Sequence, residues 1–319
     1  MAPFRSVVRL FLLVVGILVG MTTFVVAYMA RMIISPPRQR LWATPAELGM
    51  PFEDVQFPAR DGLRLSGWFI PAKLANGQQP KATLLLVHGW PWNRLGTAAE
   101  NILTDLPGSA PVQLIHLALA LHRRGFNLLM FDLRNHGQSA ASSPVTFGLQ
   151  EADDLLGALD YAADRDDVDA RRLGVIGFSM GANTTLFALP RTKQVGAAIA
   201  IQPTSPTVFS SRYGALLTGP LARLILPLAE LAYRLAGGLP LSAVEPIFAA
   251  AGSGDTPVLF IQGKGDNWGS AENVAAMVAA SPSPVEPLFV DSASRFGGYQ
   301  YVIDNPEMVE TFFTAHLTG

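Results

Sequence analysis

A serine between two glycines is the first feature of the sequence that could carry out chemistry. It stands in GFSMG, residues 177 to 181, after an apolar run that predicts a strand and before ANTTLFAL, which predicts a helix. A serine on such a tight turn is held out at the carboxyl edge of a sheet, where its hydroxyl can attack a carbonyl carbon. Gly177 and Gly181 fit this elbow because side chains there would collide with neighbouring backbone. Ser179 is therefore a candidate nucleophile, although small residues can also simply begin a helix.

Donors for the resulting oxyanion are predicted next to this serine. Attack on a carbonyl places negative charge on its oxygen, which needs hydrogen-bond donors close by. The predicted strand 82–87 is followed by HGW, so the backbone N–H of Trp90 can face that of Met180 across the site. His88 and His136 each follow a predicted strand, and we expect both to be structural rather than catalytic.

Several further motifs follow one another in the chain: TPAELGMPFEDVQFPARDGLRLSGWFIPA, HGWPWNR, FDLRNHGQS, GFSMGAN and GKGDNW. With them, residues 43 to 317 resemble an α/β-hydrolase of the bacterial serine aminopeptidase-like branch. The resemblance implies Ser179 as nucleophile and the amides of Trp90 and Met180 as oxyanion hole. It also implies Asp266, after the predicted strand 256–263, as the acid of a catalytic triad. From the residues alone Asp266 could equally be a turn residue, because KGDN is good turn chemistry.

The histidine of such a triad is missing. A hydrolase triad runs in the order serine, acid, histidine, and similar proteins place the histidine in a stretch like GADHFGAY. This chain has SASRFGGY, with Arg295 at the histidine position. A guanidinium has no acceptor and stays protonated, so it cannot be a general base. His316 is the only histidine after Asp266, and it lies ~18 Å along a predicted helix from the loop.

Two functions follow from this pattern. The first is a serine hydrolase for esters, or less favourably amides, with apolar acyl groups, either impaired or dependent on an unusual base such as His88 or His136. The alternative is a non-catalytic relative that binds an acyl or anionic ligand, or a partner protein, with Arg295 paired to Asp266. The same residues permit acyl transfer to an acceptor other than water. We expect neither a metal nor an organic cofactor.

Alternating strands and helices are predicted to position these residues. Two runs flanking ARDG predict an antiparallel hairpin, and apolar runs predict strands at 82–87, 126–131, 172–178, 195–201, 256–263 and 286–290. Helices are predicted at 111–124, 149–163, 180–189, 270–280 and 304–317. This alternation indicates the α/β class, with a mostly parallel sheet and helices on both faces. The fold implied by the resemblance is the α/β-hydrolase fold.

A helical insertion is predicted at about 203–252, where the connection between two strands is unusually long. Helical spacing relates one set of its apolar residues: Leu221, Leu224, Ile225, Leu228, Leu231 and Leu235. We expect this stripe to pack on the core, or to line an acyl pocket as part of a cap over the site. Pro227 is expected to bend or divide the helix.

The amino-terminal segment predicts a membrane anchor. Residues 10 to 30 contain no charge and lie between Arg9 and Arg31, and a helix of this length spans the hydrocarbon core. A cleaved signal peptide is the rival interpretation. The predicted organisation is an anchor at 1–34, a tether at 35–50 and the hydrolase domain at 51–319. Arginines flank the apolar run on both sides, so the membrane side is not assigned.

Composition excludes several classes of protein. The chain has 319 residues, of which 50% are hydrophobic and 15% charged, with a formal net charge of −2. The sequence has no long runs of Lys and Arg that would give a concentrated basic surface, which argues against a nucleic-acid-binding protein. With no cysteine it can form no disulfide, thiolate metal site or cysteine nucleophile.

Overall fold

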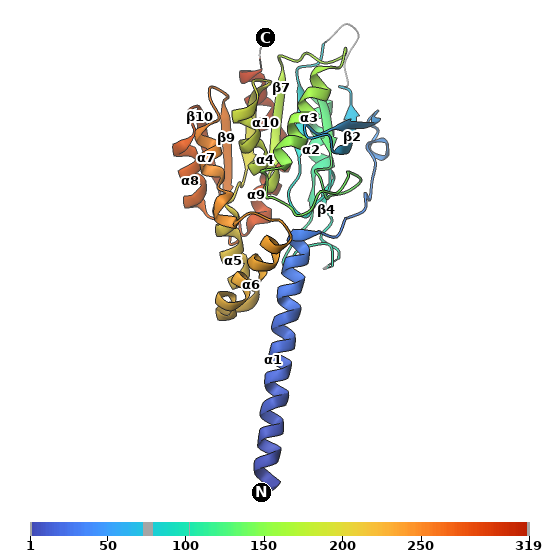
Figure 1. The fold of residues 1–319 in the computed structure, drawn as a ribbon. Coiled ribbons are helices and arrows are strands. Elements are labelled where there is room, and N and C mark those ends of the chain that lie inside the picture. The colour runs from blue at the N-terminus through green and yellow to red at the C-terminus, as the bar shows by residue number, and fades with distance from the viewer. Residues whose placement is uncertain (1, 73–78, 102, 318–319) are drawn as a thin grey trace.

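The computed structural model describes residues 2–72, 79–101 and 103–317, and its main feature is a twisted sheet with helices on both faces (Figure 1). Within these residues the sheet has eight strands in the order β1-β2-β6-β3-β7-β8-β9-β10. Of its pairings only the two that involve β2, with β1 and with β6, are antiparallel. The strands are β1 (Glu53–Pro58), β2 (Arg64–Ile70), β3 (Thr83–Val87), β6 (Asn127–Phe131), β7 (Leu173–Phe178), β8 (Val195–Ile201), β9 (Val258–Gly263) and β10 (Pro284–Val290), and β4 (Gly96–Thr97) pairs separately with β5 (Val112–Gln113).

Two groups of helices cover the sheet. On one face α2 (Leu114–Arg123), α9 (Arg295–Asp304) and α10 (Pro306–His316) contact one another. On the other face lie α3 (Glu151–Ala163), α4 (Met180–Ala188), α7 (Pro246–Ala251) and α8 (Ala271–Ala280). Every residue of β3, β6, β7 and β9 is buried, because both sides of these central strands are covered. The continuous apolar runs of the sequence therefore indicated these strands correctly.

Helix α9 was not expected from the sequence. Its two adjacent glycines lower helix propensity, yet the segment is helical and buries Phe296, Tyr299, Val302 and Ile303. Tertiary packing of these side chains outweighs the local preference. As a result Arg295 is the first residue of a helix that lies against the sheet, and not part of a loose loop.

Helix α1 (Ala2–Ile34) projects from the domain as a single rod (Figure 1). Apolar side chains along its first half are exposed, whereas Ala30 and Met32 near its end are buried and the helix packs against α6. By length and composition alone, two stretches, Ser6–Ile34 and Pro206–Leu235, could cross a membrane. A helix like α1 near the amino terminus is compatible with a signal sequence or an anchor.

The segment expected to be a tether runs along the domain surface. The Gln39 side-chain amide donates to the Asp105 carboxylate at 2.7 Å. The Asn93 side chain donates to the Arg40 carbonyl at 3.1 Å, and the Trp90 indole N–H donates to the Met32 carbonyl at 3.2 Å. Residues 35–50 therefore connect α1 to the domain through specific contacts.

The insertion between β8 and β9 forms a helical hairpin of α5 (Pro206–Thr218) and α6 (Ala222–Leu235), followed by a short turn at Leu241–Ala243 and α7. Pro227 was expected to bend or divide the helix, and it does not divide it, because α6 is continuous through this residue. The chain turns instead at Gly219–Leu221, where Gly219 has φ +58°.

The expected burial of the leucine stripe was also wrong. Exposed fractions are 55% for Leu221, 58% for Leu224, 43% for Leu228, 52% for Leu231 and 80% for Leu235. Of that set only Ile225 is buried. The opposite side of α6, with Ala229 and Tyr233, makes the contacts with the rest of the protein, so the leucines face outward.

Candidate functional site

Ser179 lies at the junction of β7 and α4, at the carboxyl edge of the sheet. Its backbone has φ 55° and ψ −114°, a strained conformation for a residue with a side chain. A Cβ on Gly177 would come within 2.4 Å of the Gly181 carbonyl oxygen, and one on Gly181 within 2.1 Å of the Val87 carbonyl oxygen. Only glycine fits at both positions, so the turn that presents the serine depends on them.

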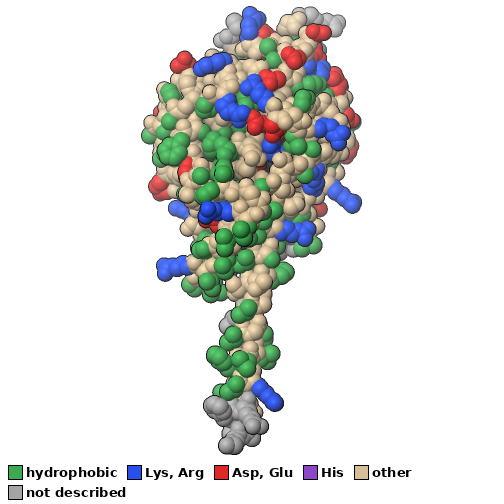
Figure 2. Space-filling model, viewed as in Figure 1, with side chains coloured by type: hydrophobic (Ala, Val, Ile, Leu, Met, Phe, Trp, Pro, Cys, Tyr) green, Lys and Arg blue, Asp and Glu red, His purple; other side chains and the backbone are tan. Residues whose placement is uncertain are grey.

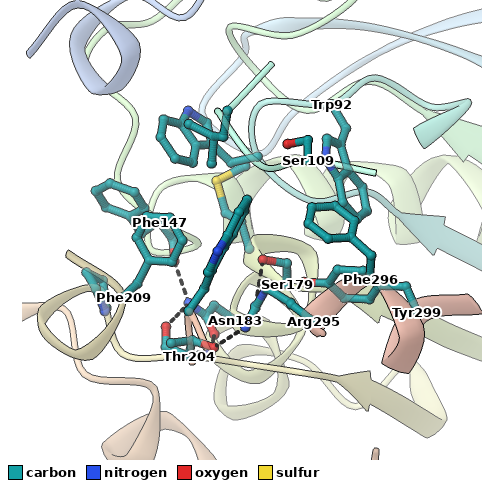
Figure 3. Close-up of a pocket in the computed structure, with 15 residues that line it drawn as sticks. Trp92, Ser109, Phe147, Ser179, Asn183, Thr204, Phe209, Arg295, Phe296 and Tyr299 are labelled. Carbon is teal, nitrogen blue, oxygen red and sulfur yellow. Dashed lines mark hydrogen bonds between the residues drawn. The ribbon is translucent and has the colours of Figure 1, made fainter. Parts of the chain in front are cut away.

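Arg295 reaches from the first turn of α9 to the serine (Figure 3). One terminal nitrogen, Nη2, donates to Ser179 Oγ at 3.0 Å and to the Gln202 carbonyl at 2.7 Å. The other, Nη1, donates to Asp266 Oδ2 at 2.5 Å and to Thr204 Oγ1 at 3.1 Å. The guanidinium therefore bridges the serine and the aspartate, where an imidazole would stand in a triad.

Asp266 is held in place by several donors besides this arginine. The backbone N–H groups of Trp268 and Gly269 donate to its Oδ1 at 3.0 and 2.9 Å. The Gln262 side-chain amide donates to Oδ2 at 3.1 Å. The Arg295 and Asp266 side chains are only 3% and 1% exposed, so the ion pair is shielded from water.

Arg295 remains a cation in this setting. Burial alone would lower the pKa of Arg295, but the charge of Asp266 more than offsets that effect and leaves the pKa above its ordinary value. Accordingly Arg295 can donate protons in hydrogen bonds but cannot accept one from Ser179.

Tyr299 is a buried neighbour of this pair. Burial raises the pKa of Tyr299 to about 12, although the nearby Arg295 charge acts in the opposite direction. The phenol is therefore neutral and cannot replace the missing base. Its hydroxyl lies close enough to Ser179 and Arg295 for both to influence its pKa, but it makes no hydrogen bond of ordinary geometry among the described residues.

The two expected oxyanion donors belong to residues that line the same pocket as Ser179. In the described part of the chain, neither the Trp90 nor the Met180 backbone N–H donates to a protein acceptor. Both amides are thus available to a ligand.

The histidines offer no alternative base. His88 is buried, its Nδ1 lies 2.7 Å from the Gly89 carbonyl oxygen, and its Nε2 accepts from the Leu133 N–H at 3.0 Å. Burial, reinforced by the neighbouring His136, lowers the pKa of His88 to about 3. His136 is also buried, with Nδ1 bonded to the Arg134 carbonyl and a lowered pKa caused by burial.

The remaining histidines lie on α2 and α10. His116 and His316 are exposed on α2 and α10, and His122 is buried at the end of α2. None of the chain's five histidines lines the pocket that contains Ser179.

The pocket over Ser179 is mainly apolar and aromatic. Trp90, Trp92, Phe147, Phe209 and Trp268 form much of its wall (Figure 3). Its cavity volume, the space open to the centre of a water-sized molecule, is about 40 Å³, so in this conformation the pocket is narrow. No cluster of three or more His, Cys, Asp or Glu side chains suited to a metal ion occurs among the described residues.

The polar residues at the site that were not singled out from the sequence include Gln202, Thr204 and Tyr299. Gln202 is bonded twice to Arg295, since its side-chain amide also donates to the Arg295 carbonyl at 2.7 Å. A signal for Gln202 and Thr204 was present, because they follow a buried strand and so lie at the carboxyl edge of the sheet. Nothing in the local sequence marked Tyr299.

Comparison with known proteins identifies the fold. A family model described as alpha/beta hydrolase fold matches residues 82–220. The uncharacterized protein YfhR of Salmonella typhimurium is 36% identical over 146 residues, which cover 46% of this chain and 42% of that protein. The polyketide transferase ATR5 of Stachybotrys chlorohalonatus is 27% identical over 190 residues, or 59% of this chain and 55% of that one. The chain thus spans about half the length of these curated relatives.

Solved structures agree with the family model. The Pyrococcus furiosus esterase Pf2001 superposes with a TM-score of 0.67 and 25% sequence identity, over 90% of this chain and 98% of that chain. An acylaminoacyl peptidase of Pyrococcus horikoshii has a TM-score of 0.56 at 18% identity, which bears on the fold alone. The chain has the α/β-hydrolase fold.

Proposed function

We propose that this chain binds an acyl ligand at Ser179 without turning it over at the rate of a serine hydrolase. The observation that carries the proposal is the position of Arg295, whose guanidinium donates to Ser179 Oγ at 3.0 Å and is paired with Asp266. In a working triad the partner of the serine accepts its proton. Here the partner is itself a donor, so it does not activate the oxygen.

The hydrogen-bonding character of the site indicates the ligand. Since Ser179 Oγ accepts from Arg295, its own hydrogen is free to point into the pocket. The amides of Trp90 and Met180 are further donors without backbone acceptors among the described residues. A pocket that offers donors and apolar walls suits a ligand whose head is a carboxylate or an ester carbonyl. The esterase Pf2001 as structural neighbour supports ester-like ligands.

The expected rate without a base is low. Serine proteases that lose a triad member retain ~10³- to 10⁴-fold catalysis over water, from the oxyanion hole and binding. That residual rate is far below the rate of a functional hydrolase. In this proposal the turn at Ser179 and the amides of Trp90 and Met180 therefore bind the acyl group without catalysing its hydrolysis.

A substitution that returns the base tests this directly. In Arg295→His the imidazole would face Ser179 and Asp266, and hydrolysis of a p-nitrophenyl ester should rise by about 10²-fold or more. Arg295→Gln is the matched control, because it removes the cation without supplying a base and should not gain activity. The gain should disappear with Ser179→Ala and shrink with Asp266→Asn. Rapid ester turnover by the unchanged protein, with no effect of Arg295→His, would contradict the proposal.

A second candidate is slow hydrolysis or acyl transfer through Ser179. The strained elbow of this serine, with φ 55°, favours it, because such strain persists at sites that use it. The similarity to the polyketide transferase supports acyl transfer as the alternative to hydrolysis. This candidate predicts that an acyl group becomes covalently attached to Ser179 in the unchanged protein, which mass spectrometry would detect.

We further propose the organisation that surrounds the site. Residues 1–34 serve as a single-pass anchor, residues 35–50 connect it to the domain, and residues 51–319 form the hydrolase domain. Within it the segment at about 203–252 acts as a cap, since Thr204, Pro206 and Phe209 from this segment line the pocket over Ser179.

A further inference from the structure

The hairpin of α5 and α6 exposes an unusually apolar surface. We call it the leucine face, and it consists of Leu216, Leu217, Leu221, Leu224, Leu228, Leu231 and Leu235, all of which are exposed. Contiguous exposed apolar patches of this kind are rare on proteins surrounded by water, and they mark contacts with other proteins or with membranes. Leu221, at the turn, and Leu224, Leu228, Leu231 and Leu235 follow one another at helical spacing along one side of α6. Leu216 and Leu217 lie at the end of α5, just before that turn.

The leucine face lies next to the amino-terminal helix. Helix α6 packs against α1, and in the space-filling view hydrophobic side chains over the hairpin continue onto α1, while most acidic side chains lie toward the other end of the domain (Figure 2). Residues 206–235 contain three arginines, Arg212, Arg223 and Arg234, and one acidic residue, Glu230. Glu230 is half-buried and accepts a hydrogen bond from the Leu241 N–H at 3.1 Å.

The place at which α6 contacts α1 sets the depth that the leucine face would have in a bilayer crossed by α1. Residues 10–30 of α1 are uncharged, and at ~1.5 Å per residue they cover about the thickness of a hydrocarbon core. Helix α6 contacts the end of α1 where Ala30 and Met32 are buried. With α1 across a bilayer, the leucine face would therefore stand at the level of the leaflet next to Arg31.

A cavity lies between α1 and the hairpin, beside the place where α1 and α6 touch. Tyr28, Met29, Met32 and Ile33 of α1 line one side, and Ser210, Tyr213 and Leu226 of the hairpin line the other. Its volume, the space open to the centre of a water-sized molecule, is about 80 Å³, and its walls are mainly apolar, so an acyl chain would have to widen it. Thus a hydrophobic space lies directly behind the leucine face.

This cavity adjoins the pocket over Ser179. Both are lined by Trp90, Leu106, Phe147, Pro206 and Phe209. The rings of Trp90 and Phe209 lie 6.0 Å apart, and those of Trp90 and Phe147 lie 5.9 Å apart, so aromatic side chains form the shared wall. An acyl chain in the cavity would have its head directed toward Ser179 once these side chains part.

We propose that the leucine face is embedded in the lipid bilayer beside α1, and that the cavity behind it is a side entrance through which an acyl chain passes from the bilayer to Ser179. The second part rests on the proposed acyl binding, and the first rests on the proposed anchor at residues 1–34 but not on acyl binding. The bilayer is the favoured occupant of the surface because the leucine face is continuous with the apolar helix that would span it. The arginines of the hairpin would then meet the phosphate groups of the lipids.

Spin labels measure the embedding. The chain has no cysteine, so Leu224→Cys, Leu231→Cys and Leu235→Cys can each be labelled in the full-length protein without background. In phosphatidylcholine vesicles these labels should collide more with oxygen than with a water-soluble nickel chelate. Arg171→Cys is the control, since its side chain is 82% exposed and lies outside the hairpin, and it should show the reverse order.

Two outcomes would overturn the embedding. One is greater accessibility of the leucine positions to the nickel chelate than to oxygen. The other is broadening of the spectra by contact between labels, which would assign the leucine face to a second copy of the chain.

A bulky side chain in the cavity tests the entrance. Ser210→Trp would fill it from α5, and Met29→Trp would fill it from α1. Ser211→Trp, on the exposed side of α5, is the matched control. With a diazirine-bearing fatty acid supplied in phosphatidylcholine vesicles, both cavity variants should be photolabelled several-fold more slowly than Ser211→Trp.

The results separate the two proposals. Equal labelling rates in the cavity variants and the control would overturn the entrance while leaving acyl binding intact. If neither the unchanged protein nor any variant binds the fatty acid at equilibrium, the proposed function and the entrance both fail. The embedding is judged by the spin labels alone in either case.

Discussion

At the scale of single residues, Arg295 changes the chemistry of the site while preserving its connections. Its two terminal nitrogens contact Ser179 and Asp266, as the two nitrogens of an imidazole would in a triad. An imidazole can receive a proton and a guanidinium cannot. The resemblance of the surrounding motifs to a hydrolase is therefore compatible with a site that recognises an acyl group and leaves it intact.

The buried histidines predict a pH dependence of stability. His88, with its pKa lowered to about 3, and His136, with its pKa also lowered, are neutral in the folded protein. In the unfolded chain both would have a pKa of about 6.5. Below that pH the unfolded chain binds more protons, so the free energy of unfolding should fall as the pH decreases, by up to about 1.4 kcal/mol per pH unit for each histidine.

Urea unfolding of the full-length protein in detergent between pH 7 and pH 5 measures this slope. His136→Gln keeps a donor for the Arg134 carbonyl but cannot be protonated, so it should reduce the slope. The comparison of the two slopes isolates the imidazole, because buried Asp154, with its pKa raised to about 7, contributes equally to both proteins and with the opposite sign. A slope unaffected by the substitution would show that the His136 imidazole is not buried as described.

At the scale of elements, α6 has two apolar sides, of which one packs against the protein and the other is exposed. Ile225 is 2% exposed and packs against the protein, while its neighbour Leu224 is 58% exposed. The hydrophobic effect stabilises the fold only through surface removed from water on folding. The leucine face therefore contributes little to the stability of the domain and is free to interact with lipid.

Adjacent substitutions separate these two sides. Ile225→Ala should lower the free energy of unfolding by about 2 to 5 kcal/mol, as expected for a large buried side chain. Leu224→Ala should change it by only about 0.5 kcal/mol, as at other surface positions. Both are measured by urea unfolding in the same detergent. Similar losses for the two variants would mean that the leucine face packs on the protein after all.

At the scale of the whole molecule, the sequence predicted the sheet better than the insertion. Uninterrupted apolar runs at 82–87 and 126–131 indicated β3 and β6 to within one residue, because only covered strands are apolar throughout. The alternation of strands and helices also predicted that the candidate residues Trp90, Ser179 and Asp266 follow parallel strands and so lie at one edge of the sheet. Arg295 could be identified as the departure from the expected pattern.

The insertion could not be predicted in the same way. A helical period shows that leucines share a side of α6, but it does not show whether that side faces protein or surroundings. The burial of Ile225, Ala229 and Tyr233 decides this, and it depends on elements far away in the sequence, α1 among them. For the same reason Tyr299 was missed, since α9 forms through tertiary packing despite its glycines.

The most direct test of the account is the rate at which a fluorophosphonate probe labels Ser179, because the probe reports activation of the serine without requiring a substrate. The account predicts slow labelling of the unchanged protein, about 10²-fold or more acceleration in Arg295→His, where a base becomes available, and no labelling in Ser179→Ala. Labelling of the unchanged protein as fast as that of Arg295→His would contradict it, because the serine would then be activated with Arg295 in place.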